Sequence, residues 1–268
     1  PTPEEYFFAS SVEEAIGFLT SHRGEAQLIA GGTALMPYFQ EGKISASRLV
    51  DISGLGALKD LQKEGGSIRI GSAVTFGRLV ESDLVGDWLP LLRVASERMG
   101  THRLRCLATL GGNLAASVGS FGGALCLLAM GAEAEIRNFT GAQWLPVEGL
   151  FVRSGLSRVD STSEIITALR VQIPSDEQVP IYMQLPGDRS GWPKLAVAAL
   201  LRPADDGRLV SASVAAGCRH GIPLRVGDLQ EALLGRRMRK PKSAELFAEG
   251  ICAWARSQDG LTFDASEL

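Results

Sequence analysis

Two widely separated glycine pairs constrain this chain more than any other feature of its sequence. Gly31-Gly32 follows an apolar run and precedes Thr33. Gly111-Gly112 follows Thr109 closely and directly precedes Asn113. A glycine pair lacks two Cβ atoms and tolerates positive φ, so successive N–H groups can turn toward a phosphate or a planar heterocycle. Either pair alone is more often a plain tight turn, but two pairs of similar construction predict one divided binding site.

The residues around the first pair predict a strand, a turn and a helix. Residues 28–30 are expected to form a short buried strand, and residues 34–39 a helix whose first N–H groups face back toward the turn. Free N–H groups at a helix start favour anions, because the helix dipole is positive there. This arrangement predicts a site for a group such as a pyrophosphate.

Apolar periodicity and turn residues predict mixed helices and strands along the remaining chain. The capping signal from Ser11 to Glu14 marks the start of the first helix. Expected helices cover residues 11–21, 76–80, 89–98, 124–130, 228–234 and 243–256. Expected strands cover residues 48–52, 58–61, 68–72, 133–137, 164–173, 194–201 and 209–218, with an edge strand at 224–226. Residues 101–106 are interpreted as a basic approach to the second glycine pair.

Composition places the chain among ordinary globular proteins. Its 268 residues allow two domains, and a net charge of -3 with 21% charged residues gives no sign of nucleic-acid binding. No long uncharged apolar run predicts a membrane span, and no basic-then-apolar leader opens the sequence. These features predict a cytoplasmic protein.

Cysteine and histidine spacing argues against a metal bound by this chain. The four cysteines contain no Cys-x-x-Cys pair, and the three histidines are far apart. We interpret all four cysteines as buried thiols in a reducing compartment. Rossmann, P-loop, zincin and hydrolase signatures are missing, and no nucleophile with a paired base is evident. Any redox chemistry therefore requires an organic cofactor.

Four segments in order give the chain a family resemblance. They are residues 28–33, 49–52, 68–72 and 105–115, the first and last of which contain the glycine pairs. With these segments the chain resembles the flavin-binding medium subunit of the molybdenum hydroxylases, the group that contains xanthine dehydrogenase and aerobic carbon monoxide dehydrogenase. The resemblance extends from Pro3 to about Arg256.

This resemblance implies an α+β fold in two parts. Residues 1–175 would form a PCMH-type FAD-binding domain with two α/β lobes, at about 1–57 and 58–175. Residues 176–268 would form a carboxy-terminal domain with a three-stranded antiparallel sheet and helices.

The resemblance also implies a function and partners. FAD would receive electrons from a small 2Fe-2S iron–sulfur subunit and pass them to an external acceptor, while a large molybdopterin-binding subunit oxidises the substrate. The chain would thus be the electron-transfer flavoprotein of a heterotrimer. The family's cofactor-binding positions correspond to Ile29, Ala30, Gly31, Gly32, Thr33, Ala34, Leu35, Met99, Thr109, Gly111, Gly112, Asn113 and Ile165, with Ile166 as the alternative to Ile165.

The sequence departs from the family pattern at three points. Gly122 stands where the family commonly has an aspartate that contacts the flavin, and Met183 aligns with a lysine found near the ring in some members. The chain also ends at Leu268, where the family usually begins another helix. Two alternatives follow: a structural subunit that has lost or weakened FAD binding, and a self-contained flavoenzyme of the same fold.

Overall fold

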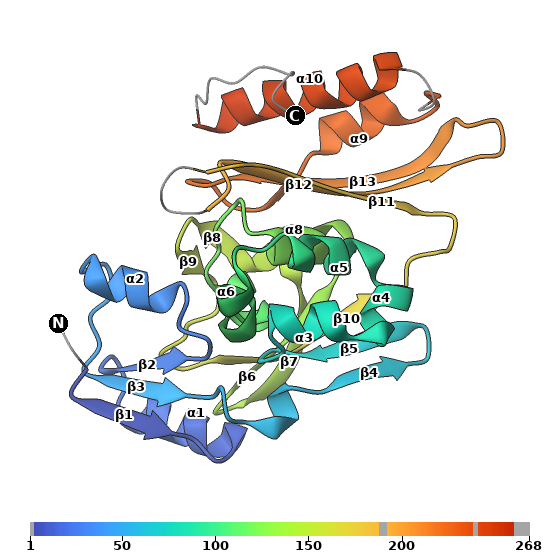
Figure 1. Cartoon of the computed structure of the whole chain (residues 1–268). Helices are drawn as coiled ribbons and strands as arrows, with labels where there is room; N and C mark the ends of the chain where they lie inside the picture. Colours follow the sequence, from blue (N-terminus) through green and yellow to red (C-terminus); the bar gives the residue numbers. More distant parts are fainter. Residues whose placement is uncertain (1–2, 188–191, 238–240, 260–268) are drawn as a thin grey trace.

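The amino-terminal part of the chain is a small parallel sheet with crossover helices. The computed structural model describes residues 3–187, 192–237 and 241–259, and Figure 1 shows this sheet at one end of the molecule. The strand order is β1-β3-β2, all parallel. The elements are β1 (Glu5–Phe8), α1 (Val12–Ser21), β2 (Ala26–Ile29), α2 (Leu35–Gln40) and β3 (Arg48–Asp51). Parallel strands need such crossovers. Both helices and the strands β2 and β3 correspond to predicted elements, whereas β1 had no predicted counterpart.

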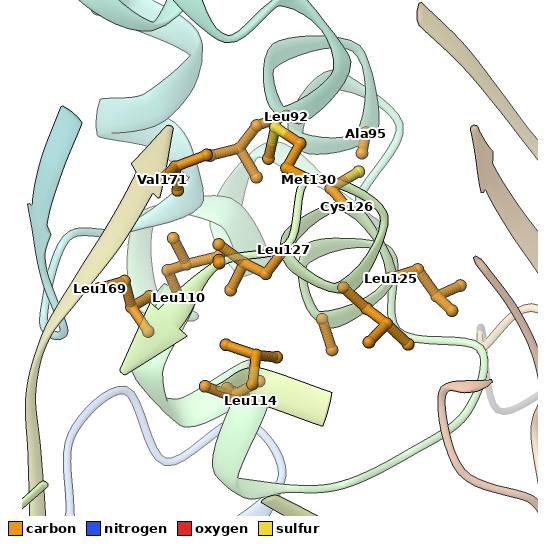
Figure 2. Packing of buried hydrophobic residues seen from close by; sticks show 14 of the residues in the cluster. Leu92, Ala95, Leu110, Leu114, Leu125, Cys126, Leu127, Met130, Leu169 and Val171 are labelled. Carbon is orange, nitrogen blue, oxygen red and sulfur yellow. The ribbon is translucent and has the colours of Figure 1, made fainter. Parts of the chain in front are cut away.

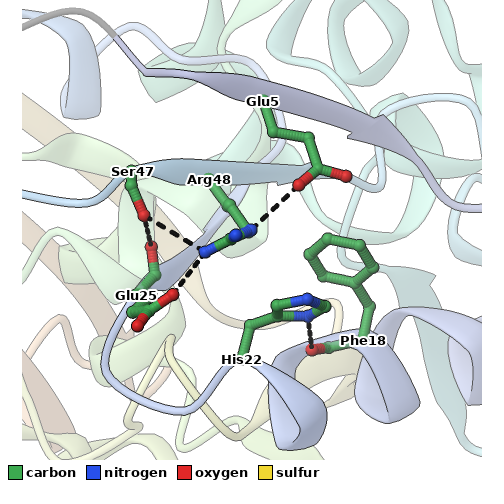
Figure 3. A network of polar contacts seen from close by, with 6 residues as sticks. All are labelled: Glu5, Phe18, His22, Glu25, Ser47 and Arg48. Carbon is green, nitrogen blue, oxygen red and sulfur yellow. Dashed lines mark hydrogen bonds and ion pairs between the residues drawn. The ribbon is translucent and has the colours of Figure 1, made fainter.

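One arginine joins the three strands of this sheet where they begin. Arg48, at the start of the central strand β3, donates from Nε to Glu5 of β1 over 2.9 Å. Its Nη1 donates to the carboxylate of Glu25, directly before β2 (Figure 3). One cation therefore contacts an acid at each neighbouring strand, which favours the observed order.

Helix α1 has the predicted amino-terminal cap in a modified form. The Ser11 hydroxyl accepts a hydrogen bond from the Glu14 N–H over 3.0 Å. The Glu14 carboxylate, however, accepts from the N–H and hydroxyl of Ser10, one residue earlier than a standard capping box. At the other end, His22 Nδ1 lies 3.0 Å from the Phe18 carbonyl oxygen (Figure 3).

Gly17 in α1 offers a test of local backbone energetics. It is exposed, and a Cβ built there meets nothing within 4 Å. Gly17→Ala should therefore raise the free energy of unfolding by roughly 0.5–1 kcal/mol, since glycine is costly inside a helix. Thermal unfolding should show a midpoint about 1 to 4 °C higher. The matched variant Gly24→Ala has equal space but a φ of +83°, and it should be destabilised by roughly 1 kcal/mol; equal midpoints for both variants would contradict this account.

A five-stranded antiparallel sheet forms the second layer, with β10 at its centre. Its order is β4-β5-β10-β6-β7. The strands are β4 (Leu61–Glu64), β5 (Ser67–Gly71), β6 (Glu133–Asn138), β7 (Gly141–Pro146) and β10 (Ile165–Gln172). The predicted strand at 58–61 is mostly wrong, because Gly56–Leu58 forms a 3-10 helix and β4 begins only at Leu61. The glycine hairpin between β4 and β5 is confirmed.

A layer of short helices separates this sheet from the carboxy-terminal one (Figure 1). It contains α3 (Phe76–Glu81), α4 (Asp83–Trp88), α5 (Pro90–Glu97), α6 (His102–Leu107), α7 (Leu110–Ala115) and α8 (Gly122–Ala129). Between α8 and β10 the chain also forms a 3-10 turn, Val147–Leu150, and the hairpin of β8 (Phe151–Arg153) and β9 (Leu156–Ser157). Figure 2 shows the leucines of α5, α7 and α8 packing with those of β10 in one core.

The third sheet is antiparallel and is buried on both faces. It consists of β11 (Val179–Leu185), β12 (Leu195–Pro203), β13 (Leu209–Cys218) and a two-residue edge, β14 (Leu224–Arg225). Even-numbered residues of β12 such as Ala198 pack toward α8. Odd-numbered residues such as Val197 pack toward α9 (Gly227–Leu233) and α10 (Pro241–Asp259). The sheet thereby fixes the helical layer on one side and two covering helices on the other.

Several elements differ from the sequence-based predictions. The segment predicted as a basic approach is helix α6, and α4, β7 and β11 had no predicted counterpart. Cys106 is exposed, so the prediction of four buried thiols is wrong at this position; the other three cysteines are buried as predicted. Residues 260–268, where the family pattern differs, lie outside the described residues. No helix of the described residues is long and apolar enough to cross a membrane.

Candidate functional site

A deep crevice lies where the first sheet, the helical layer and the third sheet meet. Its empty volume is about 1570 Å³, including solvent space at its mouth. The crevice extends from the first glycine turn, past α7, to Tyr182 and Gln184 of the third sheet, so its shape suits an elongated molecule. Both glycine pairs line it, as the idea of one divided site predicts.

The first glycine pair lines the crevice as a turn with free backbone donors. Gly32 has a φ of +68°, which a residue with a Cβ adopts only with strain. Among the described groups, none accepts a hydrogen bond from the N–H of Gly31, Gly32, Thr33 or Ala34. Consecutive free N–H groups at a concave wall are suited to an anion. Every predicted residue from Ile29 to Leu35 lines this wall.

Gly31 also brings the two walls of the crevice into contact. A Cβ at this position would lie 1.9 Å from the carbonyl oxygen of Leu107 and 3.2 Å from the Cα of Ala108. Leu107 ends α6 and Ala108 leads into α7. The first turn therefore rests directly on the backbone that carries the second glycine pair.

The second glycine pair is a helix and not the turn that the sequence led us to expect. Gly111 and Gly112 belong to α7, without positive φ, and Thr109 caps that helix by accepting the Gly112 N–H over 3.1 Å. The Gly111 N–H donates to the Ser72 carbonyl over 2.8 Å. These donors are already used inside the protein, so the expected cradle of free N–H groups is wrong here. The missing side chain serves close packing instead, since a Gly111 Cβ would lie 2.6 Å from the Cβ of Ser72.

Asn113 presents half of its amide to the crevice. Its Oδ1 accepts the Ala124 N–H over 2.9 Å and so joins α7 to α8. Its Nδ2 donates to no other described group. A side-chain donor thus remains available on the wall opposite the first turn, beside Thr109 and the two glycines.

Apolar residues complete the wall near the centre of the molecule, with one correction to the predicted set. Met99 lines the crevice as predicted, but Ile165 does not; it packs in the core beneath α1. Its neighbour Ile166 lines the crevice. Successive residues of a strand face opposite sides, so only one of the two isoleucines can reach the site.

The third sheet closes one end of the crevice through a network that the sequence did not reveal. The Tyr182 hydroxyl donates to Gln184 Oε1 over 3.0 Å, and Gln184 Nε2 donates to the Arg98 carbonyl over 3.3 Å. Arg98 Nη1 in turn donates to the Tyr182 carbonyl over 3.2 Å. Burial raises the pKa of the Tyr182 phenol well above its ordinary value, so this hydroxyl remains neutral. All three residues line the crevice.

Three aromatic side chains line one part of the crevice. The Trp192 ring lies 5.1 Å from the Phe121 ring and 6.4 Å from the Tyr38 ring, both in edge-on geometry. Trp192 lies just before β12, Phe121 in the loop before α8, and Tyr38 in α2. The crevice is therefore bounded by the amino-terminal unit, the helical layer and the segment that enters the third sheet.

Comparison with known proteins identifies the family. Residues 2–176 match the family model described as the FAD binding domain in molybdopterin dehydrogenase. The chain belongs to this family. The match confirms both the resemblance and the expected cofactor, FAD.

Individual relatives agree with this assignment over most of their length. The nicotine 6-hydroxylase medium subunit of Paenarthrobacter nicotinovorans is 29% identical over 244 residues, covering 91% of this chain and 84% of that protein. The carbon monoxide dehydrogenase medium chain of Afipia carboxidovorans is 25% identical over 260 residues, covering 97% and 90%. A solved structure of carbon monoxide dehydrogenase from Hydrogenophaga pseudoflava superposes with a TM-score of 0.87 at 24% identity, covering 94% of this chain and 87% of that one. The structural likeness supports the α+β fold.

Gly122 and Met183, two of the three departures from the expected pattern, occupy different places relative to the crevice. Gly122 lines the crevice, and a Cβ there would lie 2.3 Å from the Tyr182 hydroxyl oxygen and 2.9 Å from its Cζ. Met183 is not a lining residue, because it packs between the third sheet and its covering helices. Gln184, one residue later on β11, faces the crevice in its place.

Unpaired polar atoms show that the crevice fits a polar cofactor. The hydroxyls of Ser72 and Ser120 are buried without a hydrogen-bond partner, and both residues line the crevice. Buried polar groups are nearly always paired, so an unpaired hydroxyl in the lining of a crevice is a place where a bound molecule can supply the missing partner. FAD offers many acceptor atoms of this kind. No group of three or more described His, Cys, Asp or Glu side chains is arranged to hold a metal.

Proposed function

We propose that this chain is the electron-transfer flavoprotein of a molybdenum hydroxylase complex. In this role it receives electrons from an iron–sulfur subunit and passes them, through FAD, to an external acceptor. The observation that carries the proposal is the row of four free N–H groups from Gly31 to Ala34, in a turn that lines the same crevice as the second glycine pair.

In this proposal, residues on two opposite walls of the crevice hold FAD. The free N–H groups of the first turn bind the pyrophosphate, whose charge they match. Thr109, Gly111, Gly112 and Asn113 bound the opposite wall, with Asn113 Nδ2 as a donor. Bound FAD supplies the redox chemistry, since it accepts electrons singly and releases them as a pair. Ile29, Met99 and Ile166 exclude water beside it with apolar side chains.

Partner subunits are proposed from the relatives. Similar proteins are described as medium subunits or medium chains, a wording that implies further chains in those complexes. By analogy, a large molybdopterin-binding subunit and a small 2Fe-2S subunit would assemble with this chain. We also propose the division into an FAD-binding domain, residues 1–175, and a carboxy-terminal domain, residues 176–268; the family match ending at residue 176 supports it.

Addition of FAD should stabilise the full chain strongly. At a free FAD concentration of about 100 times Kd, binding contributes about 2.7 kcal/mol to the free energy of unfolding. For a chain of this size, the thermal unfolding midpoint should rise by about 5 to 10 °C. Differential scanning calorimetry with and without FAD measures the shift, and AMP at the same concentration is the control. An unchanged midpoint, together with no flavin absorbance in the purified chain, would contradict the proposal.

A second experiment separates electron transfer from a purely structural role. The chain is co-expressed with the products of neighbouring genes, and the purified assembly is examined for flavin content and for reduction of external acceptors. We expect one FAD per copy of this chain and a loss of acceptor reduction when FAD is removed. An intact assembly that reduces acceptors at the same rate without FAD would favour the structural-subunit alternative.

A further inference from the structure

The crevice wall at Gly122 lacks a polar side chain for a steric reason. Gly122 is the first residue of α8, and the Tyr182 hydroxyl occupies the space that its side chain would need. Tyr182 is 6% exposed and its hydroxyl is already bonded to Gln184. Neither residue therefore provides a free donor at this part of the wall.

The same loop carries a free donor two residues earlier. Ser120 is fully buried, lines the crevice, and its hydroxyl has no partner among the described groups. Its neighbour Phe121 packs against Trp192 and has no polar side-chain atom. Ser120 is thus the residue of this loop that lines the crevice and carries a buried, unpaired hydroxyl.

The cost of leaving this hydroxyl unpaired points to a role. A buried polar group without a partner is unfavourable, whereas alanine at the same place would avoid that cost. Ser117 provides a comparison within the same loop, because it is also fully buried and unpaired but does not line the crevice. Of these two serines, therefore, only Ser120 belongs to the lining of the crevice.

We propose that the Ser120 hydroxyl is a cofactor-binding group that donates a hydrogen bond to an acceptor atom of FAD. It supplies the polar contact that a side chain at position 122 cannot make while Tyr182 stands there. This inference rests on the proposed function, since it assumes that FAD occupies the crevice.

Two serine variants of the full chain test the assignment. Ser120→Ala should raise the Kd for FAD about 2- to 12-fold, the range expected for one neutral hydrogen bond. Ser117→Ala should leave the Kd within about twofold of the wild type, because Ser117 does not line the crevice and makes no hydrogen bond to FAD. Flavin fluorescence titration measures Kd, and thermal unfolding without FAD measures stability. The FAD-free midpoint of Ser120→Ala should equal or exceed that of the wild type, since an unpaired polar group is removed.

Each outcome decides the inference. Equal affinities of Ser120→Ala and the wild type, or an equal loss in Ser117→Ala, would overturn the role of Ser120. Loss of affinity accompanied by a lower FAD-free midpoint would assign Ser120 to packing and also overturn it. A wild-type chain that binds no FAD would instead refute the proposed function, and the serine assignment with it.

Discussion

Gly31→Ala should unfold more easily than the wild type and lose most of its affinity for FAD. The added Cβ would lie 1.9 Å from the Leu107 carbonyl oxygen and 2.7 Å from its carbon. Both atoms are backbone, so no side-chain rotation relieves the clash, and the first turn must move away from the wall that carries α7. Such overpacking costs about 3 kcal/mol, which corresponds to a midpoint about 6 to 12 °C lower.

The effect on FAD follows from the same displacement. The four free N–H groups begin at Gly31, so a shift of this turn misplaces the donors relative to Asn113 on the other wall. We expect the Kd for FAD to rise at least about tenfold, since more than one hydrogen bond is disturbed. The matched control is Gly54→Ala, whose Cβ meets nothing within 4 Å. If Gly31→Ala behaved like Gly54→Ala in both measurements, the two walls would not be in contact as described.

The first glycine turn was predictable because its determinants are local. An apolar run ends at two glycines, and the helix that follows has the expected length. Gly32 needs positive φ, and glycine is the residue that adopts it without cost. Strand, turn and helix therefore agree with the sequence pattern.

The second glycine pair was misread because distant residues determine its conformation. Glycine has a low helix propensity, so residues 109–113 resemble a turn when considered alone. In the structure Thr109 caps the helix, and contact with Ser72 requires that Gly111 have no side chain. The residues were the right ones for the crevice, but their backbone role depends on packing that local patterns do not contain.

The closing wall of the crevice was missed for a similar reason. Residues 179–185 become a strand by pairing with β12, and this pairing places Tyr182 and Gln184 on one face and Met183 on the other. Had that strand been recognised, its two-residue period would have shown that Met183 cannot face the same side as Tyr182. Similarly, strand alternation restricts the site to one of Ile165 and Ile166, but the sequence does not say which.

Gly122→Asp should destabilise the chain, although the family resemblance leads us to expect an aspartate at this position. The new Cβ would lie 2.3 Å from the Tyr182 hydroxyl oxygen, and Tyr182 is buried among α5, α8 and the third sheet. The variant is therefore overpacked against a buried aromatic side chain. We expect a loss of about 2–3 kcal/mol in the free energy of unfolding and a midpoint about 4 to 12 °C lower. Gly149→Asp adds the same charge at an exposed position with no atom within 4 Å of its Cβ, and it should have little effect.

The double variant Gly122→Asp with Tyr182→Leu distinguishes this steric account from a general intolerance of position 122. Leucine keeps apolar volume in the core but removes the hydroxyl and the Cζ that the new side chain meets. The two changes should therefore couple favourably, with the double variant at least about 1 kcal/mol more stable than the sum of the single effects predicts. Urea unfolding of all four chains measures this coupling. Strictly additive effects would show that glycine at 122 and tyrosine at 182 are independent, and they would contradict the steric account.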